Sequence, residues 1–136
     1  IKHFIKKNNL SNVIYINNVP RKSIDEYWSI IDCSIVHLRK EKLFNTVIPS
    51  KLFESIGMGV PILHGVKGES LNIINDYQVG IGFESENFLE LAIKIKKIFL
   101  DKELYESLKQ NCLNSRNKFD RKVLAKNMIE SINKLL

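Results

Sequence analysis

Several residue types are scarce in this sequence, and each scarcity excludes a class of protein. The 136 residues include only two cysteines, three prolines and six glycines. Cys33 and Cys112 lie far apart in apolar surroundings, so the sequence predicts neither a disulfide framework nor a metal site. This use of cysteine is typical of a protein of the reducing cytosol. The longest stretch with little charge, residues 52–66, is interrupted by Glu54, by glycines and by a proline. It falls short of the roughly 20 apolar residues of a membrane-spanning helix, so we expect neither a transmembrane nor a signal segment.

Isoleucine, lysine and asparagine are abundant, in contrast, and make up 50 of the 136 residues. Such a bias is typical of an AT-rich genome, and it accounts for much of the net charge of +6. The positive charge is spread along the chain rather than gathered in one stripe, so the sequence predicts no nucleic-acid partner. The apolar share of 44% suffices for one domain without a disulfide or metal. Because the chain begins with Ile1 in the middle of a helical pattern, we interpret it as part of a longer protein.

Short β-rich runs alternate with helical patterns over residues 1–85. We expect strands at 13–16, 33–38, 61–64 and 79–83, and helices at 1–9, from Ser23 to about residue 31, at 50–58 and at 69–76. This alternation predicts a parallel sheet with helices on both faces. Residues 86–136 carry helical patterns throughout, at 86–100, 102–117 and 120–136. The expected fold class is therefore α/β with a helical carboxyl-terminal tail.

The loops that follow the strands are the places to look for a site, because ligands of open parallel sheets bind beyond the carboxyl ends of the strands. Residues 38–51 are the most informative of these loops, since Pro49 and Ser50 open a helix whose free N–H groups can bind an anion. Lys51 adds a positive charge. Glu54, one turn later, can accept hydrogen bonds from two hydroxyls of a sugar such as ribose. Its spacing also fits a solvated glutamate that the helix dipole favours.

Other candidate residues give weaker signals. His37 and His64 stand at the carboxyl ends of predicted strands, where each can donate to a phosphate, but neither has an evident metal or base partner. Gly65 and Gly68 lie in a loop before a predicted helix and can admit a sugar or phosphate closely. No complete phosphate-binding glycine fingerprint is present, and we predict neither a metal site nor a catalytic nucleophile.

Six stretches together carry a resemblance to a known family. They are residues 13–20 (VIYINNVP), 31–38 (IDCSIVHL), 46–54 (TVIPSKLFE), 57–63 (GMGVPIL), 80–84 (GIGFE) and 119–125 (FDRKVLA). In order and spacing they resemble the carboxyl-terminal, donor-binding half of family 4 glycosyltransferases, which have the GT-B fold. The match is close to the subgroup that builds bacterial surface polysaccharides such as capsule and lipopolysaccharide.

The resemblance implies a Rossmann-like sheet, truncated at its amino end, within a partial nucleotide-sugar-binding domain at residues 1–136. Glu54 matches the second glutamate of the family's E-x7-E motif and would bind the nucleotide ribose. Thr46 replaces the first glutamate of that motif, whose usual contact is with the donor sugar. In the family's sheet, two further strands lie between the strand at Val13 and the strand at Cys33, and the resemblance implies that both fall outside these 136 residues. The acceptor domain would also lie outside them. These residues would therefore be inactive alone.

The resemblance also assigns the residues at the diphosphate and at the base. Backbone N–H groups at the helix end would bind the diphosphate, and a preceding loop would border the base. The diphosphate would lie at Ser50, Lys51 and Leu52, and the base would be bordered by Asn18, Val19 and Pro20.

The activity implied is that of a retaining glycosyltransferase that moves a sugar from a UDP-sugar to a lipid-linked or polysaccharide acceptor. We expect it in the cytoplasm, with peripheral association at the inner membrane face, and with no resident cofactor or metal. Two alternatives stay open. One is a UDP-sugar 2-epimerase with the same fold, and the other is a noncatalytic basic α/β module that binds nucleic acid or anionic lipid.

Overall fold

The computed structural model describes residues 1–135 and confirms the predicted α/β fold. Within these residues three parallel strands form one sheet, namely β1 (Ser34–His37), β2 (Ile62–Gly65) and β3 (Gly80–Gly82), in the spatial order β1-β2-β3. Helix α3 (Ser50–Met58) connects β1 to β2, and α4 (Glu69–Tyr77) connects β2 to β3. Parallel neighbours require crossovers of this kind, because a tight hairpin cannot return the chain to the same end of the sheet.

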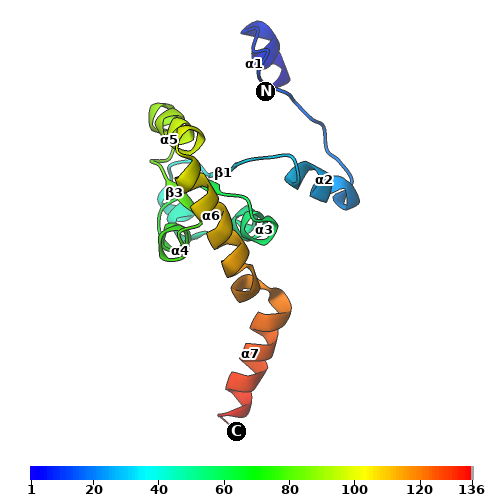
Figure 1. Cartoon of the computed structure of the whole chain (residues 1–136), viewed down its shortest axis with the longest axis vertical. Coiled ribbons are helices and arrows are strands. Elements are labelled where there is room, and N and C mark those ends of the chain that lie inside the picture. Colours follow the sequence, from blue (N-terminus) through cyan, green and yellow to red (C-terminus); the bar gives the residue numbers. More distant parts are fainter. Residues whose placement is uncertain (136) are drawn as a thin grey trace.

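The chain before and after the sheet is helical. Before it lie α1 (Lys2–Lys7), the short 3-10 helix η1 (Arg21–Ser23) and α2 (Ile24–Trp28), and a second 3-10 helix, η2 (Lys42–Thr46), precedes α3. After β3 follow α5 (Phe88–Leu100), α6 (Lys102–Ser115), η3 (Arg116–Phe119) and α7 (Arg121–Asn133). Figure 1 shows α1 and α7 extending away from the sheet in opposite directions.

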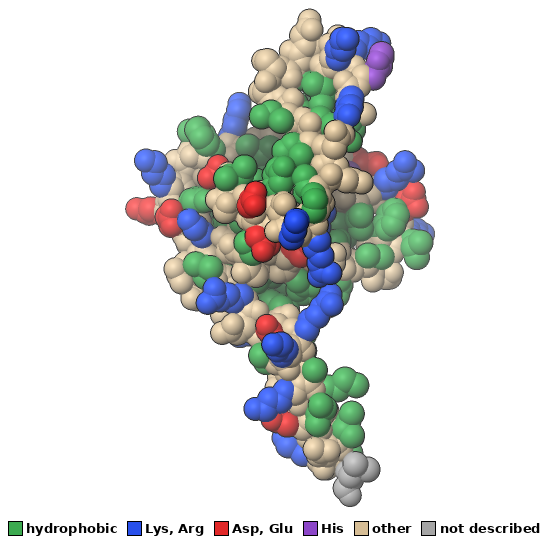
Figure 2. Space-filling model, turned by 90° about the vertical axis from the view of Figure 1, so that its right-hand side faces the viewer, with side chains coloured by type: hydrophobic (Ala, Val, Ile, Leu, Met, Phe, Trp, Pro, Cys, Tyr) green, Lys and Arg blue, Asp and Glu red, His purple; other side chains and the backbone are tan. Residues whose placement is uncertain are grey.

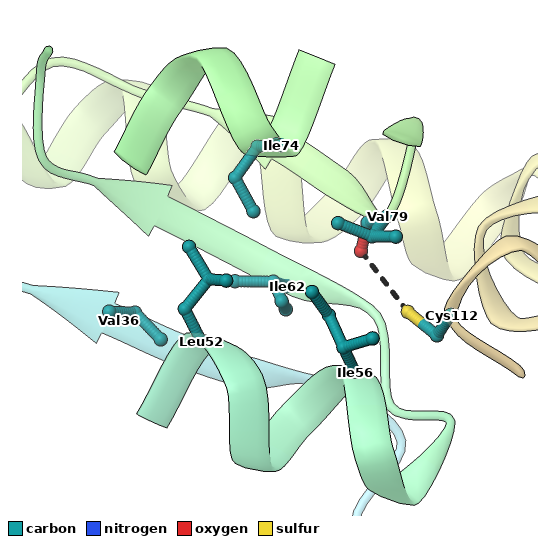
Figure 3. Close-up of a cluster of buried hydrophobic side chains, with 7 residues drawn as sticks. All are labelled: Val36, Leu52, Ile56, Ile62, Ile74, Val79 and Cys112. Carbon is teal, nitrogen blue, oxygen red and sulfur yellow. Dashed lines mark hydrogen bonds between the residues drawn. The ribbon is translucent and has the colours of Figure 1, made fainter. Parts of the chain in front are cut away.

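One face of the sheet is covered by α3 and α4, whose apolar side chains meet those of the strands in a first core cluster. Figure 3 shows Leu52 and Ile56 of α3 directed at Ile62 of β2, with Ile74 of α4 opposite them. All four of these side chains have no exposed area. The cluster consists of Val36, Leu52, Ile56, Ile62, Ile74, Val79 and Cys112.

The opposite face is covered by α5 and the first half of α6. Leu63 of β2 packs there with Ile98 of α5 and Leu108 of α6 in a second core cluster that also contains Phe83. Because successive side chains of a strand point to opposite faces, Ile62 and Leu63 serve the two clusters. Every residue of β2 is therefore buried, as expected of a central strand with helices on both sides.

Helix α6 also closes the edge at which the strands begin. The Cys112 thiol lies 3.6 Å from the carbonyl oxygen of Val60, which precedes β2, and 3.5 Å from that of Val79, which precedes β3. Burial raises the pKa of this thiol to about 12, so Cys112 is a packing residue rather than a nucleophile. The opposite edge, where the strands end, is left to the loops.

Two glycines are required by the backbone at particular places. Gly59 follows the last residue of α3 in the left-handed conformation, at φ +71°, so the helix ends at residue 58 as predicted. A Cβ atom at Gly80 would overlap the carbonyl oxygen of Ile62, so β3 can pair closely with β2 only because this position is glycine.

The structure corrects several details of the predicted elements. Residues 13–16 do not form a strand, because no described strand lies beside them to accept and donate hydrogen bonds. The second predicted helix ends at Trp28, and the Ser23 side chain makes no capping hydrogen bond. The expected loop before Thr46 contains η2, and the helix predicted at 102–117 ends as α6 at Ser115 and is followed by η3. The helix predicted at 120–136 corresponds to α7. Leu136 of that helix lies outside the described residues.

None of the helices formed by residues 1–135 is both long and apolar enough to cross a membrane.

Candidate functional site

The carboxyl ends of the three strands are tied together by one carboxylate. Glu84, which follows β3, accepts from Lys40 after β1 at 2.9 Å and from Lys67 after β2 at 2.8 Å. The ammonium groups of Lys67 and Lys40 hold the pKa of Glu84 at about 2, well below its usual range. The loops that border the candidate site are thus joined by two exposed ion pairs.

The two histidines of this edge have structural partners. His37 Nε2 accepts from the Glu86 N–H at 3.1 Å, which joins the end of β1 to the loop after β3. His64 is fully buried, and its Nε2 lies 2.9 Å from the Ser70 hydroxyl. Burial lowers the pKa of His64 to about 4, so the ring is neutral at physiological pH and enclosed beneath the loop. His64 is therefore unsuited to contact a ligand.

Helix α3 begins at the centre of the candidate site. Its N-cap is Pro49, whose backbone is extended and which contributes no side-chain capping bond. The dipole and the first N–H groups of this nine-residue helix therefore face the loops without a side-chain acceptor at the cap. Glu54 is exposed one turn later, and its Oε1 lies 3.5 Å from the Ser50 hydroxyl, the limit of a hydrogen bond. The carboxylate is thus free to take better donors.

A cavity of about 670 Å³ lies beside Glu54, between α3 and the segment that leads into α2. We call it the Glu54 cavity. Asn18 and Val19 reach it from that segment, Lys51 and Glu54 from α3, and the one tryptophan of the chain, Trp28, from α2. Its full lining is Asn17, Asn18, Val19, Ile24, Tyr27, Trp28, Ile31, Cys33, Ser34, Ile35, Lys51 and Glu54.

A second cavity, of about 950 Å³, lies on the other side of Glu54, between α3 and the segment formed by η3 and the start of α7. We call it the basic cavity, because three cations line it, Arg116, Arg121 and Lys122. Ser50 and Glu54 border it from α3. Its remaining lining residues are Ile48, Phe53, Gly57, Asn117, Phe119, Asp120 and Leu124.

The structure distributes the sequence-predicted site residues unequally. Asn18, Val19, Lys51 and Glu54 line the Glu54 cavity, and Ser50 with Glu54 lines the basic cavity. Pro20, Thr46 and Leu52 line neither cavity.

Three of these residues have local structural contacts. The Leu52 side chain is fully buried in the first core cluster, and its N–H donates to the Pro49 carbonyl at 3.1 Å. The Thr46 hydroxyl donates to the Leu43 carbonyl oxygen at 2.8 Å, and the Pro20 carbonyl accepts from the Ser23 N–H at 2.9 Å. Leu52 therefore offers a ligand neither its side chain nor a free N–H group.

Sequence reasoning missed the other residues of the two cavities. Among them are Trp28 and the cations Arg116, Arg121 and Lys122. The signal that could have found Arg121 and Lys122 is their place in the stretch FDRKVLA, which already carried the family resemblance.

Comparison with known proteins identifies the family. The sequence profile described as "Glycosyl transferases group 1" matches residues 1–114. The chain belongs to this family. Among solved structures, it is similar to a sucrose-phosphate synthase from Thermosynechococcus elongatus, with a TM-score of 0.74 and 16% sequence identity over 98% of the chain. The chain spans about a third of that structure's length, 33%, and at this identity the likeness shows the fold alone. No curated protein matches the chain.

Proposed function

We propose that this group 1 glycosyltransferase chain is the donor-binding part of a retaining, family 4 enzyme. It takes a nucleotide-sugar, of the UDP-sugar class, and passes the sugar to a lipid-linked or polysaccharide acceptor in the synthesis of a cell-surface polysaccharide such as capsule or lipopolysaccharide. The reaction takes place in the cytoplasm, at the inner face of the membrane. The acceptor is held by a part of the enzyme outside these residues.

The observation that carries the proposal is the meeting of two distant segments at Glu54. Asn18 and Val19 lie far from Glu54 in the sequence, yet they line one cavity with it and with Lys51. The cavity is apolar on the side of Val19 and Trp28 and charged on the side of α3. A nucleoside needs this combination, because its base is flat and apolar while its ribose and phosphates are polar.

The chemistry follows from the position of each group. The Glu54 carboxylate accepts hydrogen bonds from the two ribose hydroxyls, and charge-assisted bonds of this kind are among the stronger ones. The start of α3 presents N–H groups and the positive end of its dipole to the diphosphate. There they stabilise the charge that develops on the leaving group as the sugar departs. The chain thus acts by position and electrostatics rather than through a nucleophile.

A metal ion is not needed in this proposal, because positive charge is already present on both sides of Glu54. Lys51 lines the Glu54 cavity, and Arg116, Arg121 and Lys122 line the basic cavity. Together with the helix dipole, these side chains can offset the charge of a diphosphate. UDP affinity is therefore expected to be the same in excess EDTA as in Mg²⁺.

The test compares UDP with 2′-deoxy-UDP by calorimetry on the chain and on Glu54→Ala. If Glu54 binds the ribose hydroxyls, the chain prefers UDP by about tenfold, and Glu54→Ala binds UDP more weakly by about 1–3 kcal/mol and loses the preference. Glu106→Ala is the matched control, since it removes the same charge from an exposed position of α6. A UDP preference that persists in Glu54→Ala would contradict the proposal.

A further inference from the structure

The segment formed by η3 and the start of α7, residues 116–124, is held beside α3 by contacts within this chain. We call it the tail junction. The Phe119 ring packs against Phe53 of α3, with 5.2 Å between ring centres, and against Tyr77 of α4, at 4.9 Å. The Asp120 carboxylate then caps α7 by accepting from two of its first N–H groups, at 2.8 and 3.3 Å. The place of the tail junction next to α3 is therefore set by aromatic packing and by a helix cap.

The tail junction carries positive charge that is not neutralised locally. Arg116, Arg121 and Lys122 line the basic cavity with only two carboxylates, Glu54 and Asp120. None of the three cations forms an ion pair with a carboxylate in the described part of the chain. The Asp120 carboxylate is engaged with the N–H groups that begin α7, so it offsets the cations only in part. Figure 2 shows Lys and Arg side chains where the tail leaves the body of the molecule. The basic cavity is thus suited to an anion.

The start of α3 opens into both cavities. Ser50 lines the basic cavity, Lys51 lines the Glu54 cavity, and Glu54 lines both. This division follows from helix geometry, because successive side chains of a helix differ in direction by about 100°. Ser50 stands about one turn before Glu54, a rise of about 6 Å along the helix. A nucleotide whose ribose hydroxyls bind Glu54 can therefore extend its phosphates over the start of α3 to the border of the basic cavity.

We propose that the β-phosphate of the nucleotide-sugar lies in the basic cavity, where Arg116 and Arg121 bind it. Arginine suits this role, because its planar guanidinium group can donate to two phosphate oxygens at once. Lys122 adds a third positive charge. The inference rests on the proposed function and deepens it, because it assigns the second phosphate of the donor to side chains of the tail junction. All three cations lie beyond residues 1–114, so the match to the family profile gives them no role.

A part of the enzyme outside these residues is the other occupant that the basic cavity could take, since the chain spans only 33% of the structure that it matches. Such a segment would need acidic side chains to complement the three cations. The donor phosphates already carry this charge, and the ribose contact at Glu54 brings them to the edge of the same cavity. Charge and position together therefore favour the phosphate. With a protein segment as the occupant, the affinity for UDP would not depend on the arginines.

The test titrates uridine, UMP and UDP into the chain and its variants in low-salt buffer, by ligand-observed NMR. The cation variant is Arg116→Gln with Arg121→Gln. Its matched control is Lys126→Gln with Lys134→Gln, which removes the same charge from positions of the tail that line neither cavity. All four side chains are exposed, so the fold does not depend on them. Glu54→Ala serves as the variant of the ribose site.

The inference predicts that the chain binds UDP more tightly than UMP by about tenfold or more, because only UDP carries a β-phosphate. The cation variant loses this gain but keeps its affinity for uridine within about twofold, and the control keeps both. Glu54→Ala, in contrast, loses affinity for all three ligands, since each of them has the ribose hydroxyls. A failure of the ribose site is therefore distinguished from a failure of the β-phosphate contact.

Three outcomes would overturn the inference. The first is the same ratio of UDP to UMP affinity in the chain and in the cation variant, as expected if a protein segment rather than a phosphate belongs in the basic cavity. The second is an equal loss of this ratio in the control, because a general effect of positive charge would then explain the gain. The third is a loss of uridine affinity in the cation variant that matches its loss of UDP affinity, which would place the effect in the Glu54 cavity.

Discussion

The central strand and the amino-terminal segment both contain apolar runs, but only the run in the strand is buried. Ile62 in β2 has no exposed area, whereas Ile14, in the run Val13–Ile16, is 84% exposed. The run Val13–Ile16 has three β-branched residues, which favour extended backbone, whereas β2 has one, Ile62. The difference is that β2 has a strand on each side and helices on each face, while residues 13–16 have no neighbouring strand among residues 1–135. Propensity alone therefore does not make a strand.

The amino-terminal segment is held by local contacts instead. The Lys2 ammonium donates to the Asn17 side chain at 2.9 Å and lies 4.8 Å from the centre of the Tyr15 ring. Exposed contacts of this kind contribute little to stability. We conclude that β2 and the two core clusters supply most of the free energy of folding.

Replacing isoleucine by alanine in the two regions is expected to give the largest difference. Ile62→Ala should lower the free energy of unfolding by about 2–5 kcal/mol, because it removes buried methyl groups and leaves a cavity. Ile14→Ala, which removes the same atoms from an exposed side chain, should change it by less than about 0.5 kcal/mol. Urea unfolding followed by circular dichroism measures both. Equal losses would show that residues 13–16 are packed as tightly as β2.

As the pH falls, protonation of His64 should lower the free energy of unfolding before protonation of Glu84 breaks the ion pairs between the loops. His64 is buried as the neutral ring, and its pKa is about 4 against a usual 6.5. As the pH falls, the imidazole is therefore protonated in the unfolded chain before it is protonated in the folded chain. The stability from His64 is complete above pH 6.5 and is lost as the pH falls from 6.5 towards 4, by up to about 3 kcal/mol. Urea unfolding between about pH 7 and pH 5 measures this slope.

His64→Gln separates this effect from other titrations, since glutamine keeps a polar side chain near Ser70 but binds no proton in this range. The slope should flatten in His64→Gln whatever its stability at neutral pH, and it should persist in His3→Gln, because His3 is exposed. The Glu84 carboxylate, with a pKa of about 2 against its usual 4.5, loses its contribution only at lower pH. An unchanged slope in His64→Gln would show that the buried ring is not its source.

Most of the fold was predictable, because the elements that formed have patterns that long-range packing reinforces. The expected strands at residues 33–38, 61–64 and 79–83 correspond to β1, β2 and β3, and Gly59 marked the end of α3. The prediction was wrong where an element depends on a distant partner. Val13–Ile16 has the composition of a strand but no described strand beside it, and the short 3-10 helix η3 left no mark of its own in the helical periodicity.

The candidate site was predictable from the residue pattern where its residues lie close in sequence, and through the family resemblance at Asn18 and Val19. Ser50, Lys51 and Glu54 could be found together because they open one helix. Trp28 and Arg116 could not, because each reaches the cavities from a separate segment that packing alone brings near α3. Leu52 shows the opposite case, since it lies within the predicted stretch but directs its side chain into the core. The binding roles of these residues stay predictions.

Emission from Trp28 during a UDP titration tests most directly that the nucleotide occupies the Glu54 cavity. Trp28 is the one tryptophan of the chain and lines this cavity with Val19, Lys51 and Glu54, so its signal reports on the proposed site alone. We predict a saturable change in emission whose midpoint rises by about tenfold or more in Glu54→Ala. A Trp28 signal that stays constant at UDP concentrations that saturate the chain in calorimetry would contradict the account, because the nucleotide would then bind elsewhere.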